Sequence, residues 1–403
     1  MKAVVFHAVG DIRVDDVPDP TIQDPNDAIV RLTASAICGT DLHFVRGTMS
    51  GMKPGTILGH EGVGIVEEVG PNVRNLRPGD RVVIASTIAC GFCTYCRAGY
   101  YAQCDTTEPK GGTAFFGGPE AAGGYDGMQA EYVRVPYANV GCVKLPDEVT
   151  DDQAIMLSDI FPTGYFGAKL AEVQDGDTVA VFGAGPVGIF AVISAFLAGA
   201  GRVISVDRHA DRLDMAREQG AETVNFDSED PIDVIRELTG GIGPDRVIDA
   251  VGVDAEHAHG GPAAGRTETP DETFASELEQ SAPEHLDSGP FSPGDGAAPS
   301  IALRWAVRSV AKAGTIGIIG VYPPTVTSFP IGEAMNKNLS IIGGNCNHRR
   351  YIPELIGLVA SGVVEPDQVL TQRGEMVSAI DAYEKFDARV SGWTKVELTP
   401  AAG

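Results

Sequence analysis

The sequence predicts an α/β protein with two domains, one compact and β-rich, the other built on a doubly wound parallel sheet. Three observations support this fold class. The chain has 403 residues, which is enough for two domains of ordinary size. Short β-type segments separated by glycine and proline turns fill roughly the first 150 residues. From residue 177, a strand, a glycine-rich turn, a helix and a second strand follow one another, which is the order of a parallel βαβ unit.

The composition indicates a cytoplasmic protein with real cores and no membrane segment. The hydrophobic fraction is 43%, no long apolar run occurs, and the first residues lack the basic-then-apolar order of a signal peptide. A net charge of −25 argues against nucleic acid or an anionic membrane surface as a partner. The acidity is equally typical of a halophilic protein and of an ordinary acidic cytosolic one.

The β-rich domain is predicted from segments such as KAVVF, AIVRLTASAI, GVGIVEEVG, DRVVIA and AEYVRVP, with turns such as RPGD between them. Two polar pieces interrupt these strands. One is CGTDLH, from Cys38 to His43, and the other is GHEG at 59–62.

Four of the seven cysteines lie in one short stretch, CGFCTYCRAGYYAQC at 90–104. Their spacing allows four thiolates to surround one tetrahedral zinc ion. Disulfides are disfavoured in a reducing compartment, and an iron–sulfur cluster or four unrelated thiols are further alternatives. Four protein ligands leave no open coordination position, so we expect this zinc to be structural. The predicted ligands are Cys90, Cys93, Cys96 and Cys104.

The glycine-rich turn of the second domain is typical of dinucleotide binding. An apolar strand at 179–182 runs into GAGPVG, whose glycines are Gly183, Gly185 and Gly188, and the next strand ends in Asp207. Glycine lets the backbone approach a pyrophosphate at a helix N-terminus. Asp207 would accept hydrogen bonds from the adenosine ribose and repel a 2′-phosphate, which predicts NAD rather than NADP. A strand–turn–helix with glycines for packing alone is the alternative.

Later strands of the same sheet are predicted at DRVIDAVG and GTIGIIGVY, with an unusual segment at 253–300 between them. This segment holds ten acidic residues and one arginine, with six prolines and six glycines. Because such a composition buries little apolar surface, we expect a solvated and largely disordered insertion. Its histidines, His257, His259 and His285, are expected to be loop residues rather than metal ligands.

In combination and in this order, CGTDLH, GHEGVGIVEEVG, the four-cysteine loop and GAGPVG resemble the zinc-dependent medium-chain alcohol dehydrogenase family. The likeness extends to the closing GWTKVEL, and only the insertion departs from it. It implies a GroES-like catalytic domain at 1–158, completed by 343–403, and a Rossmann NAD-binding domain at 159–342. It also implies a homodimer or homotetramer and a small-molecule substrate.

The resemblance implies a second, catalytic zinc in addition to the structural one. By motif, two of its ligands are Cys38 and His60. The third position, often cysteine in the family, is Asp159 here, as in the branch that includes glutathione-independent formaldehyde dehydrogenase. Asp159 as a neighbouring support or helix cap is the alternative. Glu61 is implied to approach the zinc when water leaves.

The resemblance also assigns roles around the cofactor and the reaction. Thr40 and His43 match a relay that carries the alcohol proton to solvent. Thr163 and Val187 match positions beside the nicotinamide, and Lys395 matches a basic position near the pyrophosphate. The two remaining cysteines, Cys142 and Cys346, are interpreted as buried structural thiols.

The expected reaction is zinc-dependent hydride transfer between NAD and a small alcohol, or an aldehyde hydrate such as that of formaldehyde. A polyol, sugar or amino-alcohol dehydrogenase on the same scaffold is the first alternative. A zinc-free quinone reductase and a non-catalytic NAD-binding sensor are the others. Cys38, His60 and Asp159 argue against the quinone reductase, and a sensor would not need Thr40 and His43.

Overall fold

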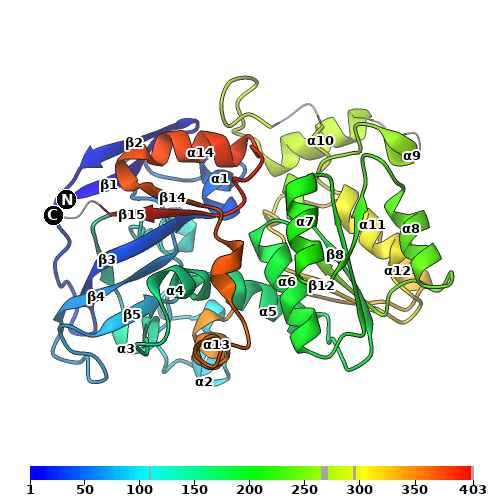
Figure 1. Ribbon diagram of the computed structural model, residues 1–403. Helices are drawn as coiled ribbons and strands as arrows, with labels where there is room; N and C mark the ends of the chain where they lie inside the picture. Colours follow the sequence, from blue (N-terminus) through cyan, green and yellow to red (C-terminus); the bar gives the residue numbers. More distant parts are fainter. Residues whose placement is uncertain (109, 265–270, 294–295, 401–403) are drawn as a thin grey trace. The chain divides into compact units, whose positions relative to one another are not determined.

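The computed structural model describes residues 1–108, 110–264, 271–293 and 296–400. The chain divides into two compact units (Figure 1). Unit 1 comprises Met1–Pro162, Glu284–Ser292 and Asn345–Gly403, and unit 2 comprises Thr163–Pro283 and Pro293–Gly344. The described part of the chain contains no helix that is both long and apolar enough to cross a bilayer.

Unit 1 is built on a seven-stranded sheet in the order β14-β15-β3-β4-β5-β7, with β6 paired to β3, and on a separate β1-β2 ribbon. The pairings are antiparallel except between β14 and β15. Alternation of buried and less buried residues is clear in β6, as expected for a half-buried strand. The strands are β1 (Lys2–Ala8), β2 (Asp11–Asp16), β3 (Ala28–Ile37), β4 (Gly62–Val69), β5 (Arg81–Ile84), β6 (Tyr132–Val135), β7 (Cys142–Lys144), β14 (Gln372–Glu375) and β15 (Val396–Thr399).

Short helices follow the strand ends of unit 1 and carry most of the residues discussed below. The α4 helix begins at a capping box in which Thr150 and Gln153 satisfy each other's backbone N–H groups. The helices are α1 (Gly39–Val45), α2 (Thr94–Arg97), η1 (Tyr101–Gln103), η2 (Glu120–Ala122), α3 (Ala138–Gly141), α4 (Asp151–Ser158), α13 (His348–Ala360), η4 (Pro366–Val369), η5 (Met376–Ser378) and α14 (Ala379–Asp387), with α5 (Ile160–Leu170) leading into unit 2.

Unit 2 has a six-stranded, wholly parallel sheet in the order β10-β9-β8-β11-β12-β13. The order reverses beside β8, which gives the topological switch point of a Rossmann fold. The predicted fold class is therefore confirmed. The elements are β8 (Thr178–Phe182), α6 (Pro186–Leu197), β9 (Arg202–Asp207), α7 (Ala210–Glu218), β10 (Glu222–Asn225), α8 (Pro231–Leu238), β11 (Arg246–Asp249), η3 (Gly252–Asp254), α9 (Gly261–Ala264), α10 (Asp271–Ser281), α11 (Ile301–Ser309), β12 (Thr315–Ile318), α12 (Ile331–Asn336) and β13 (Ser340–Gly343).

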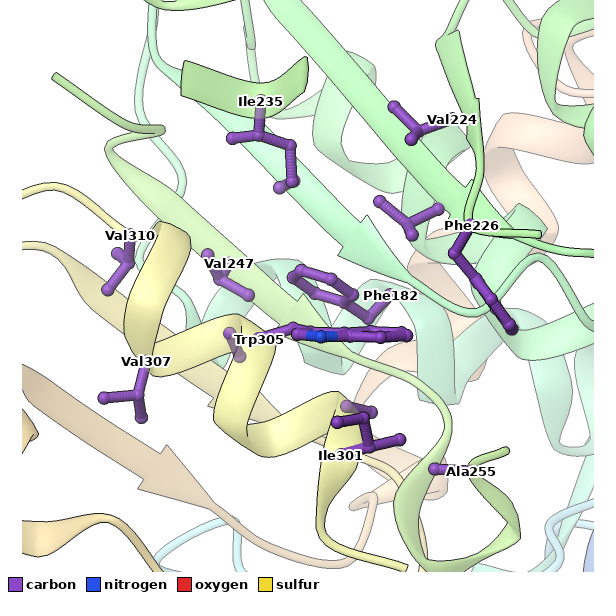
Figure 2. Close-up of a cluster of buried hydrophobic side chains, with 14 of the residues drawn as sticks. Phe182, Val224, Phe226, Ile235, Val247, Ala255, Ile301, Trp305, Val307 and Val310 are labelled. Carbon is purple, nitrogen blue, oxygen red and sulfur yellow. The ribbon is translucent and has the colours of Figure 1, made fainter. Parts of the chain in front are cut away.

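The core of unit 2 is centred on Trp305 of α11. Figure 2 shows its indole beside the ring of Phe182, with Phe226 close by. The ring centroids of Trp305 lie 6.5 Å from Phe182 and 5.2 Å from Phe226, within the range of favourable aromatic pairs. Ala255, from the start of the acidic segment, packs against the same cluster.

The acidic segment is ordered over its described residues, so the expectation of a largely disordered insertion is wrong there. In α10, Phe274, Glu277 and Ser281 are buried and lie on one helix face. Arg304 of α11 lies 3.4 Å from the Glu277 carboxylate. Phe291 is buried in the core of unit 1. A few well-spaced apolar side chains thus hold the acidic segment against the protein, although its composition suggests that it is wholly solvated. Positions 265–270 and 294–295 lie outside the described residues.

Candidate metal centres and cofactor-binding turn

Two chain segments at the same end of the neighbouring strands β3 and β4 bring the first candidate ligands together. Cys38 follows β3 and precedes α1, while His60 and Glu61 directly precede β4. Ser35 of β3 pairs with Gly62 of β4, so the residues just beyond this pair lie side by side. The antiparallel register therefore places a thiol, an imidazole and a carboxylate beyond the same end of these two neighbouring strands.

Asp159 completes this cluster from the end of α4. Its Oδ2 lies 3.8 Å from Cys38 Sγ and 3.3 Å from His60 Nε2. One ligand atom from each of Cys38, His60, Glu61 and Asp159 lies within 4.8 Å of the others, and all four residues are buried. The structure therefore brings together the residues that the sequence predicts as the catalytic zinc site.

The electrostatics of this cluster fit a bound cation. Burial raises the pKa of the Cys38 thiol, and it also raises the pKa of Glu61. His60 Nε2 and Glu61 Oε1 are buried and make no hydrogen bond. Buried polar atoms without a hydrogen-bond partner are costly unless something compensates them. Thiolate, imidazole and carboxylate groups are each zinc ligands, and three such ligands leave a fourth position open.

A buried network orients His60. Asp41 Oδ1 lies 3.0 Å from His60 Nδ1, and Asp41 Oδ2 accepts from Cys38 N (2.9 Å) and Gln129 Nε2 (3.2 Å). Gln129 Oε1 in turn accepts from Tyr383 O–H at 2.8 Å. With Nδ1 engaged by a carboxylate, Nε2 is the nitrogen turned to the cluster, the usual arrangement of a metal-binding histidine. Asp41 lies inside the CGTDLH motif, but its role was not inferred from the sequence.

Lys395, which is expected near a pyrophosphate, has a completely buried side chain. Its ammonium donates to the Glu61 carboxylate and, at 3.1 Å, to the carbonyl of Ile37. Burial alone would lower the pKa of Lys395, but the Glu61 carboxylate outweighs it and keeps the pKa above its ordinary value. Lys395 is thus the counterion of Glu61.

Sequence reasoning missed His348, which contacts the cluster from the first residue of α13. Its Nε2 bonds to Asp159 Oδ1, and its Nδ1 lies 3.2 Å from Thr87 Oγ1. Burial opposes ionisation of Asp159, but the imidazoles of His348 and His60 hold the pKa of this carboxyl well below its ordinary value. The available signal was the histidine in NCNHRRY, just after the last strand of the parallel sheet.

The two residues of the expected proton relay lie on α1, directly after Cys38. Thr40 is half-buried and His43 is buried. Their spacing of three residues places both side chains on one helix face.

The four cysteines of the loop around α2 form a second cluster in unit 1. Their sulfurs lie within 4.8 Å of one another, with Cys90 Sγ 4.0 Å from Cys96 Sγ and Cys93 Sγ 4.0 Å from Cys104 Sγ. Four sulfurs about 2.3 Å from one ion would be about 3.8 Å apart. None of the four is in a disulfide. The geometry fits one tetrahedral ion.

Backbone N–H groups already point at these sulfurs. Cys90 N donates to Cys104 Sγ (3.3 Å), Cys93 N to Cys90 Sγ (3.3 Å) and Cys96 N to Cys93 Sγ (3.5 Å). Burial opposes ionisation, but hydrogen bonds from Thr107 and Cys90 lower the pKa of Cys104 to about 6. Such bonds stabilise thiolates.

Cys142 and Cys346 are buried outside this cluster. The metal-type clusters found among the described residues include none of the three histidines of the acidic segment, His257, His259 and His285.

The glycine turn of unit 2 joins β8 to α6. A Cβ on Gly188 would lie 1.9 Å from the carbonyl oxygen of Gly183, so no larger residue fits there. Gly183 has a φ of +91°, which favours glycine. Gly185 precedes α6 as its N-cap. Val187 lies in the first turn of α6, and Thr163 lies on α5, both half-buried.

Asp207 ends β9 beside this turn. Its Oδ2 accepts from Ala184 N (2.7 Å), and its Oδ1 accepts from Arg208 N (2.7 Å) and His209 N (3.0 Å). Burial opposes ionisation, but Arg212 and these N–H groups lower the pKa of Asp207. Arg208 is held by Asp227 (3.2 Å) and by Glu256. A charged carboxylate therefore faces the turn. Arg208 is engaged by acidic partners, whereas Arg212 Nη1 would lie 3.8 Å from a Cβ on Gly185 in the turn itself.

Comparison with known proteins agrees with this geometry. Residues 24–147 match the alcohol dehydrogenase GroES-like domain family, and residues 186–258 match the zinc-binding dehydrogenase family. The zinc-type alcohol dehydrogenase-like protein AdhB of Bacillus subtilis is 39% identical, over 99% of this chain and 100% of its own length. The glutathione-independent formaldehyde dehydrogenase of Pseudomonas aeruginosa is 40% identical, over 64% of this chain and 68% of its own. The alcohol dehydrogenase TADH from Thermus sp. ATN1 matches with a TM-score of 0.80 and 33% identity, covering both chains completely.

Proposed function

Because the chain belongs to the zinc-type alcohol dehydrogenase family, we propose that it oxidises small alcohols, or aldehyde hydrates such as that of formaldehyde, with NAD as the hydride acceptor. The family assigns the coarser activity, an oxidoreductase of the zinc-dependent alcohol dehydrogenase type with a small-molecule substrate. The substrate and the cofactor are the proposed part.

The observation that carries the proposal is the convergence of Cys38, His60 and Asp159 on one buried point. These three residues would hold a catalytic zinc, and Glu61 would approach it as an alternate ligand. When bound, the zinc would supply Lewis acidity that lowers the pKa of a substrate hydroxyl. The four-cysteine loop would hold the second zinc and shape the chain around it.

Thr40 and His43 would remove the substrate proton. Both follow Cys38 on α1, so the helix that starts at one metal ligand also carries the relay. In the proposed relay the Thr40 hydroxyl would accept the proton from the substrate, and His43 would pass a proton on to solvent.

Asp207 supports NAD as the cofactor. Its charged carboxylate would accept hydrogen bonds from the ribose hydroxyls and repel a 2′-phosphate. The neighbouring Arg208, which could otherwise attract that phosphate, is engaged by Asp227 and Glu256. The glycine turn would hold the pyrophosphate at the N-terminus of α6. Thr163 and Val187 would flank the nicotinamide, which supplies the hydride acceptor.

Aspartate at position 159 supports a substrate as small as formaldehyde hydrate. The resemblance associates aspartate in this place with the formaldehyde dehydrogenase branch, and a relative of that name aligns with 64% of the chain.

We propose a homodimer or homotetramer as the assembly, which light scattering of the purified protein would establish.

A screen of nicotinamide reduction by absorbance tests the proposal. The substrates are short primary alcohols, polyols, sugars, amino alcohols and formaldehyde, each with NAD and with NADP, at low and at multimolar salt because the net charge is −25. Steady NADH formation from small alcohols or formaldehyde, lost in His60→Ala, is the expected result. Turnover confined to polyols, sugars or amino alcohols would move the assignment to those classes. Absence of turnover from protein with two zincs per chain would contradict the proposal.

A further inference from the structure

His348 is a buried histidine that no part of the proposed reaction uses. It is the first residue of α13, and only 4% of it is exposed. Both ring nitrogens have partners inside unit 1, with Nε2 on Asp159 Oδ1 and Nδ1 at 3.2 Å from Thr87 Oγ1. A side chain held at both ends beside a metal-type cluster is suited to fixing the position of its neighbour.

The two partners determine which nitrogen carries the proton. A carboxylate only accepts hydrogen bonds, so the contact with Asp159 requires a hydrogen on Nε2 of His348. In the neutral ring Nδ1 is then an acceptor, and the hydroxyl of Thr87 donates to it. Thr87 is itself buried.

The contact also distinguishes the two oxygens of Asp159. Oδ1 is taken by His348, while Oδ2 faces Cys38 Sγ at 3.8 Å and His60 Nε2 at 3.3 Å. Asp159 sits just past the end of α4 with φ −142° and ψ −66°, outside helical geometry. The helix alone therefore does not fix its carboxylate, and a side-chain partner has to.

We propose that His348 is a positioning residue that holds Asp159 Oδ1 so that only Oδ2 is presented to the catalytic metal. The inference rests on the proposed function, because it assumes a zinc at this cluster. It gives Asp159 the support that Asp41 gives His60.

The four-cysteine loop anchors this arrangement. Asn347, the N-cap of α13, accepts a hydrogen bond from Ala102 N at 2.9 Å. Ala102 lies between Cys96 and Cys104. The loop thus holds the start of α13, α13 places His348, and His348 orients Asp159. An ion in the loop would act on the catalytic site through this chain of contacts.

The test compares two substitutions of His348 that fill similar space. His348→Leu removes the donor, whereas His348→Gln keeps an N–H near the position of Nε2. His7→Leu is the matched control, since it removes another histidine–aspartate contact of unit 1, to Asp15 at 2.7 Å. Zinc release to a chelator is followed by metal analysis, with Cys38→Ser identifying the phase that belongs to the catalytic zinc. Cobalt-substituted protein provides the absorption spectrum of the site.

We expect His348→Leu to bind the catalytic zinc about 10–100-fold more weakly and to change the cobalt spectrum. The affinity of His348→Gln for the catalytic zinc should stay within about threefold of that of the parent protein. The affinity of His7→Leu should equal that of the parent protein. Loop zinc should be retained in all three. Wild-type zinc affinity in His348→Leu, or equal losses in the Leu and Gln variants, would overturn the positioning role.

A second variant covers the case in which His348→Leu does not fold. Thr87→Val keeps the shape but removes the hydroxyl that holds His348 Nδ1 at 3.2 Å, so it should weaken binding of the catalytic zinc by several-fold. Unchanged affinity in that variant would overturn the inference. A wild-type protein that binds zinc only in the loop would instead refute the proposed function, and with it the premise of this inference.

Discussion

Replacing Lys395 with methionine tests whether this lysine is an internal counterion. Lys395 and Glu61 have completely buried side chains and form an ion pair. Methionine fills much of the same volume but leaves the Glu61 carboxylate without its partner. It also leaves the carbonyl of Ile37 without the hydrogen bond it now accepts.

The expected cost can be worked out from these contacts. Breaking a buried ion pair by removing one partner typically costs about 3–5 kcal/mol. Replacing the carboxylate as well, in Glu61→Gln/Lys395→Met, removes the uncompensated charge, so most of the loss should be recovered. About 1 kcal/mol should remain from the hydrogen bond to Ile37.

Urea titrations of the parent, both single variants and the double variant give the coupling free energy directly. NAD affinity is measured on the same proteins. A loss below 1 kcal/mol in Lys395→Met, with NAD binding weakened tenfold or more, would refute the counterion role. That result would return Lys395 to the pyrophosphate, as the family resemblance implied.

Three further changes have defined outcomes. Burial raises the pKa of Glu397 to about 7, above its unfolded value, so the folded state binds this proton more tightly and stability falls as pH rises from about 4.5 to about 7. After a discount for solvent screening, Glu397→Gln should raise the free energy of unfolding by about 1–2 kcal/mol at pH 8 and change it little at pH 4, as measured by thermal unfolding. An equal increase at both pH values would contradict this. Asp159→Ala should retain one zinc per chain by metal analysis and lose alcohol oxidation by at least about 100-fold; two retained zincs would exclude Asp159 as a ligand. Asp207→Ala should weaken NAD binding by about tenfold and narrow the preference over NADP in titrations; an unchanged preference would exclude this role.

The parts of the site that depend on local spacing could be predicted from the sequence. The four-cysteine loop closes on itself within fifteen residues, and the glycine turn connects adjacent elements. Cys38 and His60 were expected only from their match to the family's motifs, and the structure brings them together because β3 and β4 are neighbours with a fixed register. For the loop and the turn, the chain between the partners is short, so the sequence pattern itself indicates that they meet.

Partners from distant parts of the chain could not be predicted in this way. His348 meets Asp159 across 189 residues, and Lys395 meets Glu61 across 334. The local motifs around these residues do not name their partners, because each contact depends on how α13 and the residue just before β15 pack in unit 1. The order of the acidic segment was missed for a similar reason. Composition averages over its residues, whereas Phe274 and Phe291 act individually.

The charges gathered in unit 1 explain why these distant residues matter together. Asp41, Glu61 and Asp159 are buried carboxylates around the Cys38 thiol, a concentration of negative charge that is expensive in a low dielectric. Lys395 offsets one carboxylate. Asp41 and Asp159 accept hydrogen bonds from neighbouring groups. Burial lowers the pKa of His60, but Asp41 and Cys38 outweigh burial and raise that pKa well above its ordinary value, so His60 also offsets part of the charge. A divalent cation held by Cys38, His60 and Asp159, as proposed above, would supply further compensation for this charge.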